Sequence, residues 1–195
     1  MSELNIHKDI IDRLQVFITN KKIPNIIFHG PMGSGKRTLL NKFINMIYEN
    51  DNMLIQNNTL QVNCAHGKGI KFIREDLKFF AKTNINIKNG NFFKSIILLN
   101  ADKLTMDAQS ALRRCIELFS HTTRFFIIVE DKYKLLKPIL SRFCEIYISL
   151  PLINNKITNL YTYNLDKYFN FKIDKQKRRS LYPNTRVSTP PICHR

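Results

Sequence analysis

Cysteine, long apolar runs and acidic side chains are all scarce in this sequence. The four cysteines stand singly, without the C-x-x-C pairs typical of zinc sites. The apolar runs at 95–99 and 125–129 have the length of strands, far short of the roughly 20 residues that a membrane-spanning helix needs. No basic and then apolar leader opens the chain. We therefore expect an intracellular protein with reduced thiols, with neither membrane insertion nor secretion.

The shortage of acidic residues leaves the chain strongly basic. Its 31 Lys and Arg residues face only 15 Asp and Glu residues, which gives a net charge of +16. Such a charge favours a polyanionic partner such as nucleic acid, although solvated lysine faces would give the same composition. The abundance of Asn, Ile and Lys suggests an AT-rich genome, with a large DNA virus or a eukaryotic parasite as candidates.

Short apolar strands alternate with amphipathic helices from the N-terminus to about residue 150. We expect strands at 25–30, 59–63, 95–99, 124–129 and 144–149. Because these strands are apolar on both faces, they predict an α/β fold with a five-stranded parallel sheet covered by helices on both sides. We also expect Thr105 to cap the helix that follows the third strand, and a later short helix to end near Pro138.

The character of the chain changes beyond Pro151. Residues 1–150 are predicted to form one nucleotide-binding domain, and 151–175 a short helical segment. Residues 176–195 are basic and proline-rich without apolar periodicity, so we expect a disordered tail. The run KQKRR at 175–179 could be a nuclear targeting signal or a nonspecific DNA-binding arm.

The stretch GPMGSGKRT has the G-x-x-x-x-G-K spacing of a phosphate-binding loop and lies between a predicted strand and a predicted helix. In such a loop the backbone N–H groups point at the β-phosphate, and the lysine neutralises the β and γ oxygens. The alternative is a glycine-rich turn with an incidental lysine. The candidate nucleotide-binding residues are Gly30, Pro31, Met32, Gly33, Ser34, Gly35, Lys36, Arg37 and Thr38.

The parts that hold Mg²⁺ in such proteins are incomplete here. Arg37 stands where a Ser or Thr normally binds the ion, and Thr38 comes one residue too late on the helix. The third strand ends LLNADK without two adjacent acids, so Asp102 is the one carboxylate left as a weak metal ligand; its other reading is an acid at a helix entry. We expect weakened affinity for Mg²⁺.

Four segments in order resemble the small subunits of AAA+ clamp loaders, the replication factor C type. They are IPNIIFHGPMGSGK, LQVNCAHGKGIKFIREDLKFFA, ILLNADKLTMDAQSALRRCIE and KPILSRFCEIYI. The resemblance covers residues 5 to 150 and implies the AAA+ fold of P-loop NTPases. It also implies that ATP is the nucleotide and that the chain acts in DNA replication.

The resemblance assigns roles to further residues. Arg142, in Ser-Arg-Phe, would reach the γ-phosphate of ATP in a neighbouring subunit as an arginine finger in trans; the alternative is a surface or salt-bridged arginine. Lys68, Lys71, Arg74 and Lys78 would contact the DNA backbone, unless they are a solvated lysine face. Gln109 with Arg113 or Arg114 would couple subunits, unless they are ordinary polar residues on a helix surface.

The chain also departs from the family pattern. Where the family reads D-E-A-D, this chain has Leu99, Asn100, Ala101 and Asp102, and Glu130 replaces the usual polar sensor. These changes predict a subunit that binds nucleotide and hydrolyses little or none of it. After Pro151 there is room for at most part of the family's helical lid and none for its collar. We therefore expect either a truncated or frameshifted product or a fragment, or a subunit that assembles by a different route.

The expected partners are other clamp-loader subunits in a hetero-oligomer, a sliding clamp and primer-template DNA, in a nucleus or at a viral replication site. Three alternatives stay open. One is an independent AAA+ DNA-dependent ATPase, such as a branch-migration motor or a helicase loader. The others are a small-molecule phosphotransferase built on the same loop and a degenerate paralogue without function.

Overall fold

A computed structural model describes residues 6–65, 71, 73–82, 93–153 and 156–169 of the chain. These residues fall into two compact units, one ending at Leu160 and the other beginning at Tyr161. The predicted basic tail at 176–195 lies outside the described residues, and the predicted boundary at residue 150 stays a prediction.

The first unit is built on a five-stranded sheet in the order β2-β3-β4-β1-β5, with every neighbouring pair parallel. The strands are β1 (Ile26–His29), β2 (Thr59–Asn63), β3 (Lys94–Leu99), β4 (Thr123–Val129) and β5 (Cys144–Tyr147). Each lies where the sequence predicts a strand. The predicted parallel sheet is confirmed, and its central strands β3, β4 and β1 are almost wholly buried.

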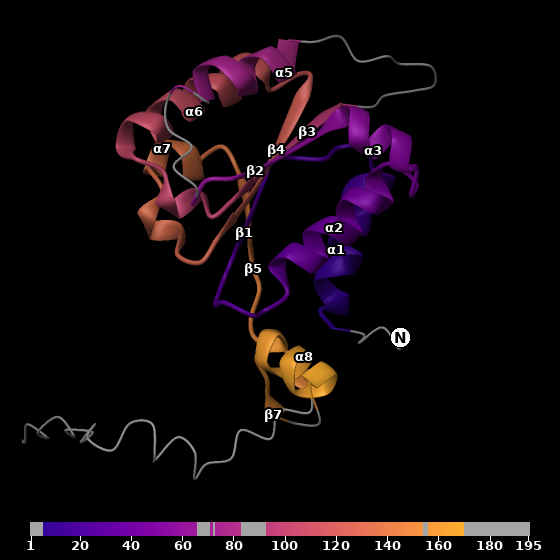
Figure 1. Cartoon of the computed structure of the whole chain (residues 1–195). Helices are drawn as coiled ribbons and strands as arrows, with labels where there is room; N and C mark the ends of the chain where they lie inside the picture. The colour runs from indigo at the N-terminus through magenta and orange to yellow at the C-terminus, as the bar shows by residue number, and fades with distance from the viewer. Residues whose placement is uncertain (1–5, 66–70, 72, 83–92, 154–155, 170–195) are drawn as a thin grey trace, which may run out of the picture. The chain divides into compact units, whose positions relative to one another are not determined.

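Helices cover both faces of the sheet (Figure 1). One face carries α1 (Lys8–Thr19), α2 (Lys36–Ile47) and α3 (Asn52–Asn58). The other carries the π-helical turn η1 (Ile73–Leu77) with α5 (Lys78–Lys82), α6 (Met106–Phe119) and the short α7 (Lys137–Leu140).

Alternate side chains of each strand pack into the two hydrophobic cores, one on each face of the sheet, because successive side chains of a strand point to opposite faces. In β3, Ile96 and Leu98 pack on the α6 side, whereas Ile97 and Leu99 pack on the α2 side. Each fully buried side chain of this size contributes about 1.5–3 kcal/mol through removal from water. The sheet therefore lies fixed between two apolar layers, and its strand ends provide a rigid edge.

Most predicted helix features are confirmed. Thr105 Oγ1 accepts a hydrogen bond from the backbone N–H of Ala108 at 3.3 Å and caps α6, as expected. Most apolar side chains of α2 face the core and are buried, as the alternation of strands with amphipathic helices predicts, and so are Ile73, Leu77 and Ala81 in the helix after β2.

The short helix expected to stop near Pro138 corresponds to the 3₁₀ turn η3 (Lys132–Lys134), which ends four residues before this proline; the next helix, α7, then begins at Lys137. Pro138 lies in the first turn of α7, because proline lacks the N–H that a helix leaves unpaired at its start. Two short strands, β6 (Leu152–Ile153) and β7 (Lys156–Ile157), form an antiparallel pair that the sequence did not predict. The helix α8 (Leu160–Phe169) follows them. No helix in the described part of the chain is both long and apolar enough to cross a membrane.

Candidate nucleotide-binding site

The phosphate loop joins the carboxyl end of β1 to the start of α2, so it lies at the edge of the sheet where a central strand ends. Its three glycines adopt positive φ angles of 145°, 76° and 92° at Gly30, Gly33 and Gly35. A Cβ atom at Gly30 would lie 2.2 Å from the backbone oxygen of Ile148. Only glycine fits there, because the loop passes directly against the chain that leaves β5.

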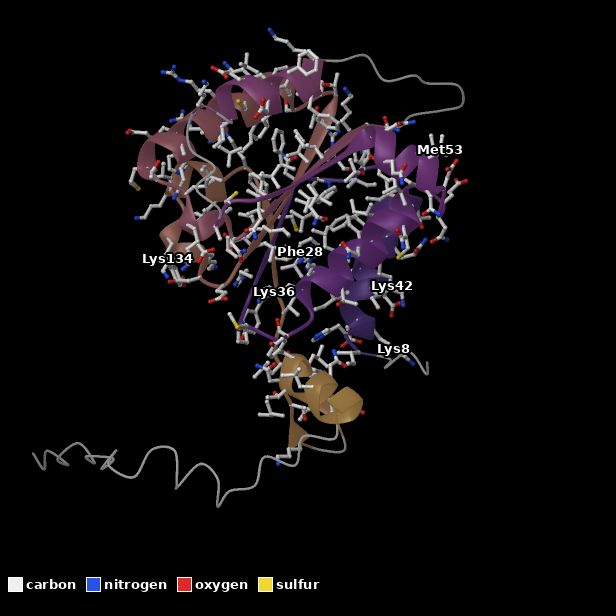
Figure 2. All side chains as sticks on the ribbon, in the orientation of Figure 1. Lys8, Phe28, Lys36, Lys42, Met53 and Lys134 are labelled. Atoms are coloured by element: carbon white, nitrogen blue, oxygen red, sulfur yellow. The ribbon has the colours of Figure 1, made fainter. Side chains whose placement is uncertain are left out.

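Lys36 opens α2 and lies at this edge of the sheet (Figure 2). The lysine is buried, and its Nζ donates hydrogen bonds of 2.7 Å to the carbonyl oxygens of Gly30 and Pro31. Burial lowers the pKa of Lys36, while the charges of Glu130 and Asp102 act in the opposite direction. The ammonium group is thus held inside the loop, in the position from which a phosphate-binding lysine acts.

The side chains around this loop do not fit a protein-held Mg²⁺ ion. Arg37 and Thr38 are exposed, and Leu99, in place of the family's first acid, is buried in the apolar core. Asp102 and Glu130 are the carboxylates whose charges reach Lys36. Within the described residues, no group of three His, Cys, Asp or Glu side chains is arranged to hold a metal ion.

The position of the family's second acid is also occupied by a neutral group. Nδ2 of Asn100 donates a hydrogen bond of 2.8 Å to Oδ1 of Asn63. Asn63 ends β2 and Asn100 follows β3, and the two strands are neighbours in the sheet. An amide cannot take a proton from water as a carboxylate can, so this pair offers no general base.

Arg142 follows the turn after α7 and makes an ion pair with α6. Its Nη2 lies 2.5 Å from Oε1 of Glu117, and its Nη1 donates to the carbonyl oxygen of Pro138 at 2.5 Å. Nε of Arg113 lies 3.0 Å from the same Oε1 atom. The hydrogen bond from Arg113, followed by the charges of both arginines, lowers the pKa of Glu117 despite some desolvation. The structure thus brings together Arg142 and Arg113, two residues predicted to act between subunits.

Gln109, predicted to couple subunits together with Arg113 or Arg114, is buried inside the unit. Its Nε2 donates to the carbonyl oxygens of Leu104 and Lys134 at 3.1 Å each, and its Oε1 accepts from the N–H of Leu136 at 2.9 Å. The side chain thereby joins α6 to the segment that leads to α7. Arg114 is exposed on α6.

The chain is similar in sequence to replication factor C small subunits. It is 38% identical over 153 residues to that of Thermofilum pendens, which covers 78% of this chain and 45% of the relative. It is 40% identical over 136 residues to that of Sulfurisphaera tokodaii, which covers 69% of this chain and 40% of the relative. The chain belongs to the replication factor C small-subunit family. It spans about half the length of the curated relatives that it matches.

A solved structure shares the fold of this chain. A DNA polymerase III gamma subunit-related protein of Thermotoga maritima superposes with a TM-score of 0.61 at 19% identity, covering 82% of this chain and 55% of that one. The fold is that of the AAA+ P-loop NTPases, as predicted. No protein-family model matches the chain.

The residues that the replication factor C resemblance assigns to DNA lie on or before the helix that follows β2. Lys71 is exposed and Lys78 half-buried. Arg74 belongs to η1, and Lys68 lies outside the described residues. Their role in DNA binding stays a prediction.

Three residues that touch the loop or its surroundings were missed by the sequence reasoning. His7 and Asn159 donate hydrogen bonds to carbonyl oxygens of the loop, and Asn63 pairs with Asn100. A polar residue at the end of the apolar strand β2 is a signal for Asn63, because strand ends line this edge of the sheet. The sequence carries no comparable signal for His7 or Asn159, whose partners lie 27 and 127 residues away.

Proposed function

We propose that this chain is a clamp-loader subunit that binds ATP through residues 30–38 and hydrolyses little or none of it. Membership of the replication factor C small-subunit family supports the role in DNA replication. The proposal of limited hydrolysis is supported by a contrast between two parts of the nucleotide site. Lys36 sits inside a well-formed loop, whereas buried Leu99 and amide-paired Asn100 stand where the family has acids.

Nucleotide binding would use the groups that the loop already orders. The backbone N–H groups at the start of α2 and the partial positive charge of its N-terminus face the phosphates. Lys36 exchanges its carbonyl partners, Gly30 and Pro31, for phosphate oxygens. Since the protein supplies few ligands for Mg²⁺, any bound ion is held mainly by the nucleotide itself, and its affinity is low.

Arg142 would serve the ATP of a neighbouring subunit. A guanidinium keeps its charge at all physiological pH values and presents its donors in a rigid plane, which suits a developing phosphate charge. The ion pair with Glu117 holds this plane at the surface, where the Arg142 side chain is 32% exposed. Arg113 and Arg114 lie on α6, the helix that carries Glu117, and both are exposed. They are the candidates for contacts that fix the register between subunits.

The proposed partners follow from this role. They are other clamp-loader subunits, a sliding clamp and primer-template DNA, whose backbone Lys68, Lys71, Arg74 and Lys78 would contact. The net charge of +16 supports a polyanionic partner. The protein would act in a nucleus or at a viral replication site.

Reconstitution tests the proposal. The chain is mixed with the clamp-loader subunits and the clamp encoded by the same genome, and association is followed by size-exclusion chromatography and pull-down. We expect a complex whose DNA-stimulated ATP turnover falls when Arg142→Ala is introduced, while the chain's own affinity for ATP stays unchanged. Arg13→Ala, at an exposed position on α1 to which no role between subunits is assigned, serves as the comparison for charge loss alone. Absence of any association with subunits or clamp would contradict the proposal.

The rival function is an independent AAA+ ATPase acting on DNA. It requires turnover by this chain alone, since no neighbouring subunit would supply the missing groups. Robust ATP hydrolysis by the purified chain in the presence of DNA would favour that rival.

A further inference from the structure

Three consecutive carbonyl groups of the phosphate loop accept hydrogen bonds from donors outside the loop. The oxygen of Met32 accepts from Nδ2 of Asn159 at 3.0 Å, and that of Gly33 accepts from the backbone N–H of Leu160 at 2.8 Å. The oxygen of Ser34 lies 2.9 Å from Nε2 of His7. Because a carbonyl oxygen can only accept, His7 carries a proton on Nε2. The donors come from two segments, one before α1 and one after β7.

These carbonyl bonds control where the loop's N–H groups point. Each peptide unit is planar and trans, so its C=O and N–H point in opposite directions. Holding the carbonyl groups of Met32, Gly33 and Ser34 outward therefore turns the N–H groups of Gly33, Ser34 and Gly35 inward. Inward N–H groups are the feature by which such a loop binds phosphate.

Asn159 packs closely on the loop, and His7 adopts an unfavourable backbone conformation. A Cβ atom on Gly33 would lie 1.8 Å from Oδ1 of Asn159, so the amide packs directly on the glycine backbone. His7 adopts a φ of 59°, in the left-handed region that residues other than glycine seldom occupy. Such an outlier persists where the surrounding contacts hold it, and it often marks a functional site.

We propose that His7 and Asn159 are positioning residues of the nucleotide site, which clamp the loop carbonyls outward and so hold its N–H groups toward the phosphates. The proposal rests on nucleotide binding by this loop, as proposed above. It gives the segments before α1 and after β7 a direct influence on nucleotide affinity, although neither contains part of the G-x-x-x-x-G-K motif.

Three substitutions separate this role from simple bracing of the fold. His7→Gly removes the imidazole and places at φ 59° the residue that prefers it, so the Tm should stay equal or rise. Asn159→Asp keeps the size of the side chain but removes its donor and adds a negative charge. Thr158→Ala is the matched control, because its hydroxyl bonds to the carbonyl of Lys156 and not to the loop.

Binding is measured by titration with fluorescently labelled ADP and ATP, using the full chain. We expect His7→Gly to weaken binding about 5-fold, the usual effect of one lost hydrogen bond. Asn159→Asp should weaken it about 10-fold or more, because the carboxylate also repels the phosphates. Thr158→Ala should bind like the parent. Unchanged affinity in both loop-facing variants would overturn the proposal.

A second measurement tests the positioning role of His7 and Asn159 separately from nucleotide binding by the loop. NMR order parameters of the Gly33, Ser34 and Gly35 amides are compared between the parent and the variants without nucleotide. Lower order in His7→Gly and Asn159→Asp supports the clamp, and unchanged order overturns it. If the parent bound no nucleotide at all, the proposed function would fail, and the order parameters would still decide whether the clamp exists.

Discussion

Asn100 and Asn63 join the ends of β3 and β2 through a hydrogen bond of 2.8 Å between their side-chain amides. The bond lies at the edge of the sheet where the phosphate loop begins. It leaves a neutral amide where the family pattern has an acid that activates water. The fold is that of the AAA+ P-loop NTPases, and the two neighbouring strand ends carry amides rather than carboxylates at these positions.

Lys36→Ala should abolish measurable nucleotide binding. The substitution removes the ammonium group that lies 2.7 Å from the carbonyls of Gly30 and Pro31 and that would contact the phosphates. Lys42→Ala, at an exposed position on the same helix, is the matched control and should bind normally. Isothermal titration calorimetry with ADP and ATP measures both. Retained binding by Lys36→Ala would show that the nucleotide binds elsewhere.

Gly30→Ala should unfold at a lower denaturant concentration. The new Cβ would lie 2.2 Å from the backbone oxygen of Ile148, which cannot move without disturbing β5, and the φ of 145° disfavours alanine. We expect a loss of about 3 kcal/mol in the free energy of unfolding. Gly35→Ala meets only the flexible end of Leu160 at 2.9 Å, so its loss should be smaller. Urea titration followed by circular dichroism compares the two, and equal stability of Gly30→Ala and the parent would contradict this view of the loop.

Gln109→Leu should destabilise the unit by about 3 kcal/mol. Leucine fills the space but leaves two carbonyl oxygens and one N–H group, all at least partly buried, without the partner that Gln109 provides. Ser110→Ala, exposed on the same helix, should change the free energy of unfolding by no more than about 0.5 kcal/mol. Thermal and urea unfolding measure both variants. If Gln109→Leu had the same free energy of unfolding as the parent, the three hydrogen bonds would not stabilise the unit, and a role of Gln109 in contacts between subunits would be favoured instead.

The ion pair of Glu117 with Arg142 and Arg113 should make stability depend on acid pH. The pKa of Glu117 in the folded protein lies below its ordinary value of 4.5, so the unfolded chain takes up the proton first. The pair therefore stabilises fully above pH 4.5 and loses its effect as the pH falls through the lower folded pKa. Glu117→Gln should have a lower Tm than the parent at pH 7 in low salt, and the difference should vanish near about pH 3. A difference that persists at this acid pH would assign the effect to packing.

The strands and the faces of the helices could be predicted from the sequence because they repeat a simple apolar pattern. The two-residue period of β3 places Ile97 on one face of the sheet and its neighbours Ile96 and Leu98 on the other; which helices cover each face comes from the fold. Gln109 also follows an available pattern, since it shares the buried face of α6 with Ala108 and Leu112.

The other features depend on information that no local pattern carries. Pro138 lacks an N–H group, which suits both the end and the start of a helix, and the fold determines which applies. The strands β6 and β7 have two residues each, too few for any period. His7 and Asn159 reach the loop only because the sheet brings distant segments together.

The most direct test of the account is steady-state ATP hydrolysis by the purified chain, with and without primer-template DNA. The parent and Arg37→Ser are measured beside Lys36→Ala, which defines the background from contaminating ATPases, and nucleotide binding is confirmed in the same samples. We expect the parent and Arg37→Ser to bind ATP and to show no turnover above that background, because Leu99 and Asn100 still stand where acids would be needed. Turnover above background from either protein would contradict the account.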